Sequence, residues 1–207
     1  MSKKKKITLL AHPKRVIKKN KDGLEEDITG LICAYIFLLS SFLLLVQVLD
    51  NFKFTIVDMD TTYKVILLPI VFFIVNVITK KFGFKIATKA IVISALAGYL
   101  ISLIFNIPIA NKINIFITFG DLLGFIVSMF INLSIYYYLL INTKMTTFPI
   151  ILTYTFSLLI NNLTSMLFKY NMIYSSYFWQ EYLLLIMIQL VIIIPLSLID
   201  NEVKRGI

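Results

Sequence analysis

Six apolar segments, each about as long as a lipid bilayer is thick, dominate this chain. They cover residues 28–49, 63–79, 86–107, 113–141, 148–168 and 182–199. An α-helix needs roughly 20 apolar residues to cross the hydrocarbon core, and continuous apolar runs indicate helices rather than barrel strands. Because 59% of the 207 residues are apolar, a soluble fold of this size could not bury them all. The sequence therefore predicts an all-α integral membrane protein, a bundle of six transmembrane helices.

A short basic turn joins the second and third segments. Residues 69–90 read PIVFFIVNVITKKFGFKIATKA, with Lys80, Lys81, Lys85 and Lys89 around the turn. Cationic turns resist translocation, so this turn is predicted to lie on the cytoplasmic side of a membrane hairpin.

The basic residues fall mainly on one side of the predicted bundle. With the N-terminus inside, sixteen of the 20 Lys and Arg residues lie on the inner side, and the other four are Lys53, Lys64, Lys112 and Lys169. The positive-inside rule therefore predicts that both termini are cytoplasmic in a multi-pass protein of the inner (plasma) membrane. Aromatic belts are predicted at the outer surface around residues 174–179 and at the inner surface around residues 136–138.

Residues 1–27 form a polar tail before the predicted transmembrane domain of residues 28–207. Nine basic residues lie within the first 21 positions. Such a tail beside a membrane attracts anionic lipid, at about 1 kcal/mol per charge near the surface. We expect lipid contact by this tail, although a basic segment can also bind nucleic acid or a ribosome; nucleic acid is not expected as a partner.

Polar residues line one face of the fourth segment. Asp121 is a carboxylate well inside a predicted span, and Ser128 and Asn132 follow it by 7 and 11 residues. On a helix both lie within about 20° of Asp121, so the three form one inward stripe. Gly120 and Gly124 beside it permit close approach of another helix or a ligand. The stripe is predicted to be a polar wall of a substrate cavity, or alternatively a set of hydrogen bonds between helices.

Side-chain amides recur on the other segments. Asn161 and Asn162 lie in a stripe of Ser and Thr residues on the fifth segment, where hydroxyls commonly bond their own backbone. Each amide offers two donors and an acceptor, which suits a planar heterocycle carrying both. The predicted substrate-binding residues are Asn76, Asp121, Ser128, Asn132, Asn161, Asn162 and Gln189.

The hairpin around the basic turn also resembles a known family. The matching features are a proline, a phenylalanine, an aromatic–glycine turn and a basic helix start, at Pro69, Phe72 or Phe73, Phe82-Gly83 and residues 85–89. This pattern is similar to that of the vitamin-uptake-type (VUT) family, whose best-known branch transports queuosine precursors. The resemblance covers the second to sixth segments, and Pro195 matches a proline in the family's last helix.

The chain departs from that family where the family carries carboxylates. Asn76 stands at an expected aspartate, Lys80 at an expected glutamate, and Asn132 and Asn162 at or near further aspartates. These changes keep hydrogen bonding and remove charge. The resemblance implies a secondary carrier or facilitator for a deazaguanine base. In such a carrier the asparagines would recognise the base through hydrogen bonds, and Asp121 would be the charged or proton-sensitive group.

Other kinds of chemistry have little support in the sequence. It contains no P-loop motif, and one cysteine and one histidine cannot build a zinc site. We therefore expect no enzyme activity, no metal and no cofactor. Two alternatives to a carrier stay open: a substrate-binding subunit of a vitamin importer powered by a separate ATPase, and a non-transporting membrane scaffold that recruits partners through the tail.

Overall fold

The computed structural model describes residues 17–19, 25–49, 52–56, 59–109, 115–142, 146–170 and 176–203. The chain forms two compact units, residues 1–34 and residues 35–207, and the boundary falls within helix α1 (Ile28–Leu49). In the first unit, strand β1 (Ile17–Lys19) pairs antiparallel with strand β2 (Glu25–Asp27). The sequence predicted no strands in this tail.

The predicted helices are present. After α1 come helices α2 (Lys64–Phe82), α3 (Phe84–Ile109), α4 (Ile115–Asn142), α5 (Thr147–Tyr170) and α6 (Ser176–Glu202). Among the described residues, five helices are long and apolar enough to cross a membrane, namely all but α3. The helical fold predicted from the apolar segments is thus confirmed, and the structure supports a multi-pass membrane protein.

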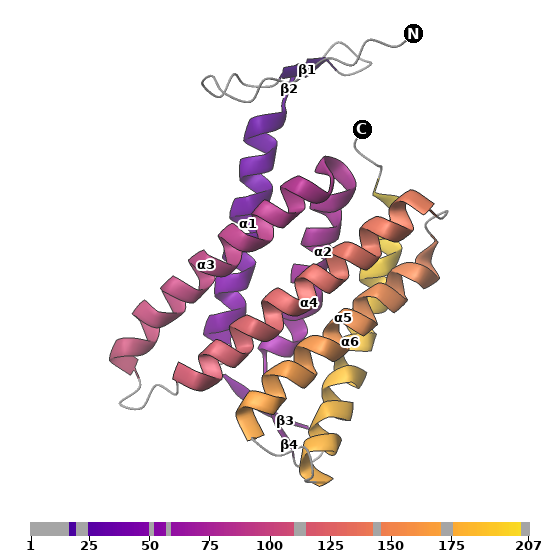
Figure 1. The fold of residues 1–207 in the computed structure, drawn as a ribbon. Helices are drawn as coiled ribbons and strands as arrows, with labels where there is room; N and C mark the ends of the chain where they lie inside the picture. Colours follow the sequence, from indigo (N-terminus) through magenta and orange to yellow (C-terminus); the bar gives the residue numbers. More distant parts are fainter. Residues whose placement is uncertain are drawn as a thin grey trace. The chain divides into compact units, whose positions relative to one another are not determined.

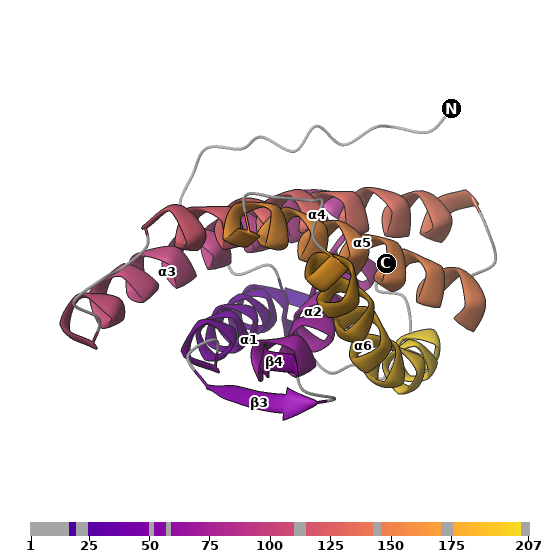
Figure 2. The same ribbon diagram turned by 90° about the horizontal axis from the view of Figure 1, so that it is seen from below.

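Helix α2 is the central element of the second unit. It packs against α3, α4 and α6 and also contacts α5, while α4 and α5 lie side by side (Figures 1 and 2). Nearly all of its residues from Val71 to Lys80 are buried. Val71, Phe72 and Val75 are fully buried in the apolar core. A polar side chain in the second half of α2 is therefore removed from solvent, and it loses free energy unless it finds a hydrogen-bond partner inside the protein.

The turn between α2 and α3 depends on one glycine. Gly83 has φ +84°, a left-handed conformation that glycine adopts without steric cost. Its N–H donates to the Thr79 carbonyl at 2.9 Å, which closes the last turn of α2. The tight turn predicted from the aromatic–glycine pair is therefore present in the fold.

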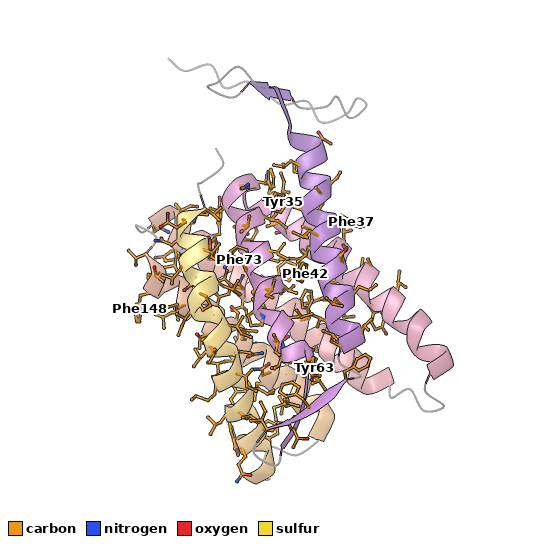
Figure 3. All side chains as sticks on the ribbon, turned by 180° about the vertical axis from the view of Figure 1, so that it is seen from behind. Tyr35, Phe37, Phe42, Tyr63, Phe73 and Phe148 are labelled. Atoms are coloured by element: carbon orange, nitrogen blue, oxygen red, sulfur yellow. The ribbon has the colours of Figure 1, made fainter. Side chains whose placement is uncertain are left out.

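A small β-hairpin precedes α2, at the opposite end of that helix from the Gly83 turn. Strand β3 (Lys53–Ile56) pairs antiparallel with strand β4 (Met59–Thr62). The rings of Phe54 and Tyr63 lie 4.7 Å apart, and Tyr63 is labelled in Figure 3. The sequence predicted a plain loop here, because period-two alternation is too brief in four-residue strands to be recognised.

Large apolar side chains remain exposed around the helices. Phe37 and Phe148 are 73% and 68% exposed and project outward, whereas Phe42 and Phe73 lie between helices (Figure 3). Exposed apolar residues also recur along α3 and α6, at Val92, Leu96 and Leu100 and at Met187, Val191 and Leu198. An apolar surface of this extent needs a partner such as lipid.

Candidate functional site

Two buried asparagines face each other between α2 and α4. Asn132 Nδ2 donates to Asn76 Oδ1 at 2.7 Å, and both side chains are fully buried. Their other polar atoms, Asn76 Nδ2 and Asn132 Oδ1, have no hydrogen-bond partner among the described residues. The pair therefore leaves one donor and one acceptor unused inside the bundle.

One helical turn from Asn132, a second polar contact joins α4 to α5. Ser128 Oγ lies 3.4 Å from Asn161 Oδ1, and the same hydroxyl also donates to the Phe125 carbonyl at 2.9 Å. Ser128 and Asn132 are both fully buried, as the predicted inward stripe requires. Asp121, the first residue of that stripe, lies in α4, but its side chain falls outside the described residues.

A third amide contact joins α5 to α6. Asn162 Nδ2 donates to Gln189 Oε1 at 2.7 Å, and Gln189 Nε2 donates back to Asn162 Oδ1 at 3.4 Å. Asn161 and Asn162 thus turn to opposite neighbours, the first to α4 and the second to α6. Six of the seven predicted residues form one buried polar band across α2, α4, α5 and α6; they are Asn76, Ser128, Asn132, Asn161, Asn162 and Gln189.

Hydroxyl groups on α5 donate hydrogen bonds to backbone carbonyls of the same helix. Thr153 donates to the Pro149 carbonyl at 2.9 Å, and Ser157 donates to the Thr153 carbonyl at 2.8 Å. Thr164 does the same toward Ile160 at 2.8 Å. These bonds confirm the expectation that hydroxyls in the Ser and Thr stripe bond their own backbone. The amides, rather than the hydroxyls, connect the helices.

A second buried cluster was missed by the sequence analysis. Lys80 Nζ lies 3.6 Å from Asp200 Oδ1 and donates a hydrogen bond to the Asp200 carbonyl. Tyr136 OH donates to Asp200 Oδ1 at 2.7 Å, and Tyr154 OH donates to Asp200 Oδ2 at 3.1 Å. The cluster therefore joins the same four helices as the amide band. Tyr154 also lies beside the Asn76 amide, so the two sets adjoin.

Two predictions need correction because of this cluster. The sequence places Lys80 in a basic turn, but it is only 5% exposed and belongs to α2. Tyr136 was assigned to an aromatic belt, but it is fully buried, whereas Tyr138 is 64% exposed. In both cases Asp200 supplies the polar partner that lets the side chain enter the interior. Asp200 itself was overlooked because the sixth segment was ended at Ile199, whereas α6 continues to Glu202.

Asn162→Leu is expected to destabilise the protein by about 1–3 kcal/mol, because it leaves the buried Gln189 amide without its partner. The double variant Asn162→Leu/Gln189→Leu removes both polar groups, so most of that loss is expected to be recovered. Thermal unfolding in detergent measures both values. A double variant less stable than Asn162→Leu would contradict this account.

The described site offers hydrogen bonds and one buried ion pair. Within the described ranges, no three His, Cys, Asp or Glu side chains come together as a metal site requires. Comparison of the chain with protein-family models, curated proteins and solved structures finds no match.

Proposed function

We propose that this chain is a membrane transporter that takes up a small heterocyclic solute, a queuosine precursor of the deazaguanine type. The observation that carries the proposal is the pair Asn76 and Asn132, which holds an unused donor and an unused acceptor in the interior. A helix contact that only holds a bundle together has no need of unpaired amide atoms, because each one costs free energy when buried. A site for a polar solute does need them.

The proposed topology has six spans with both termini in the cytoplasm of a plasma (inner) membrane. Helix α3 has 26 residues, which is long enough to serve as the sixth span. The distribution of Lys and Arg favours this orientation, since Lys81, Lys85 and Lys89 flank the turn between α2 and α3. In this topology the β3–β4 hairpin lies on the outer side.

The proposed mechanism is alternating access by a secondary carrier or facilitator. The polar band crosses α2, α4, α5 and α6 and lies between apolar stretches of these helices. A solute bound there would be reached from one side of the membrane at a time, as these helices move relative to one another. The resemblance to the VUT family supports the choice of a deazaguanine base.

We expect cells that express this chain and lack their own carrier to show saturable uptake of labelled queuine. Asn132→Leu is expected to abolish the uptake per molecule of protein in the membrane, because leucine supplies no hydrogen bond to the solute. Ser134→Leu is the matched control, since Ser134 is exposed on the same helix. A working family member expressed in the same cells serves as the positive control.

The proposal fails if that positive control takes up queuine and this chain does not. A large membrane partner and ATPases that copurify with the chain would then favour the importer subunit. Loss of cellular function on deletion of residues 2–21, with Asn132→Leu tolerated, would favour the scaffold.

A further inference from the structure

The four buried asparagines of the polar band are not equivalent. Asn162 and Gln189 form a closed amide pair, in which each side chain both donates and accepts. Asn161 Oδ1 lies within reach of the Ser128 hydroxyl. Asn76 and Asn132 differ, because they share a single hydrogen bond of 2.7 Å and do not close the second one.

The open pair is costly as it stands. Asn76 and Asn132 are each 0% exposed, so bulk water does not reach the two unused atoms. A buried polar group without a partner costs about 1–3 kcal/mol. Buried polar atoms in proteins almost always have a partner, and an unpaired one calls for an explanation. Here the two unpaired atoms are complementary, one donor on α2 and one acceptor on α4.

We propose that Asn76 Nδ2 and Asn132 Oδ1 together bind the cis-amide (lactam) edge of a planar ligand. The ligand carbonyl accepts from Asn76 Nδ2, and the adjacent ligand N–H donates to Asn132 Oδ1. This inference rests on the proposed transport function and deepens it, since it assigns recognition to the pair between α2 and α4. The amides on α5 and α6 then belong to the polar band but form no hydrogen bonds to the lactam edge of the ligand.

The same two atoms select against charged groups. A carboxylate offers only acceptors, so it would meet Asn132 Oδ1 with like partial charge. An ammonium group offers only donors and would meet Asn76 Nδ2 in the same way. A neutral group with a donor next to an acceptor satisfies both atoms at once. A lactam is a planar heterocycle that carries such an edge.

The test measures ligand-induced thermal stabilisation of the full chain purified in mild detergent. The probes are hypoxanthine and uracil, each compared with its N-methylated counterpart, which keeps the ring and loses the lactam N–H. A ligand that binds the folded state raises the melting temperature in proportion to its affinity and concentration. We expect both lactams to stabilise the protein and the methylated forms to do so far less.

Asn76→Asp tests the donor alone. It keeps an oxygen for the bond from Asn132 Nδ2 and, when ionised, replaces the unused N–H₂ with an acceptor, so affinity is compared at alkaline pH. Lactam affinity is expected to fall about tenfold to hundredfold, the equivalent of one lost buried hydrogen bond. Asn142→Asp makes the same chemical change at an exposed position of α4, where affinity is expected to be unchanged.

Equal stabilisation by lactams and their N-methylated forms overturns the inference, and so does full lactam affinity in Asn76→Asp. If no probe stabilises a protein that melts cooperatively, the inference also fails. Failure of the transport proposal looks different, because lactams then stabilise the protein while cells take up no labelled queuine. Uptake that survives in Asn76→Asp would leave transport standing and remove this pair from recognition.

Discussion

Lys80→Met is expected to lower the free energy of unfolding by about 3–5 kcal/mol, the usual cost of removing one partner from a buried ion pair. Asp200 is fully buried, and without Lys80 the partners that remain for its carboxylate among the described residues are the hydroxyls of Tyr136 and Tyr154. Methionine preserves the length and most of the apolar contacts of the lysine stem. The loss therefore reports the charge rather than the packing.

The measurement is thermal or denaturant unfolding in mild detergent. Lys85→Met is the matched control, because Lys85 is the second residue of α3 and its side chain is exposed. The double variant Lys80→Met/Asp200→Leu removes both charges and is expected to be more stable than Lys80→Met. If Lys80→Met unfolds at the same point as Lys85→Met, the ion pair does not stabilise the bundle.

The helices were predictable because their signal is local. Each apolar segment needs only its own residues to be recognised, and α1 begins and ends at Ile28 and Leu49, where the apolar run does. The Gly83 turn was equally predictable, because glycine adopts the left-handed backbone conformation of this turn without steric cost. The β3–β4 hairpin was not, because its four-residue strands carry too short a pattern.

The site was predictable on one helix at a time. Helical geometry placed Ser128 and Asn132 on one inward face, and both are fully buried. The same geometry applied to α6 puts Asp200, eleven residues after Gln189, on a shared face, and both are buried. The sequence therefore carried this signal, but a charged residue at position 200 suggested that the apolar span ends before it.

Partners across helices could not be predicted from the sequence. Lys80 and Asp200 are 120 residues apart, and Asn76 and Asn132 are 56 apart. A single sequence specifies which face of a helix is polar but not which helix that face meets. For Asn161 and Asn162 the adjacent positions suggested a common role, whereas the structure turns them to α4 and α6 respectively.

Gly124→Leu is expected to destabilise the protein by about 3 kcal/mol, at the upper end of the usual cost of overpacking. A Cβ at this position would lie 3.2 Å from the Asn161 carbonyl oxygen and 3.3 Å from both Ser165 Oγ and Thr164 Cβ. A backbone carbonyl cannot rotate away as a side chain does, so a leucine must push α5 from α4. Gly124→Ala requires a shift of only a few tenths of an ångström and is expected to cost about 1 kcal/mol.

Gly124 lies one turn before Ser128 on α4, so separating the helices there also lengthens the contact between Ser128 and Asn161, which is already 3.4 Å. Unfolding in detergent measures whether stability falls in the order glycine, alanine, leucine at position 124. The control is Ser134→Leu, on the exposed face of the same helix. If Gly124→Leu is as stable as Ser134→Leu, α4 and α5 do not pack closely at this glycine. If the graded order holds, α4 and α5 pack closely at this glycine, and their approach keeps Ser128 within reach of Asn161.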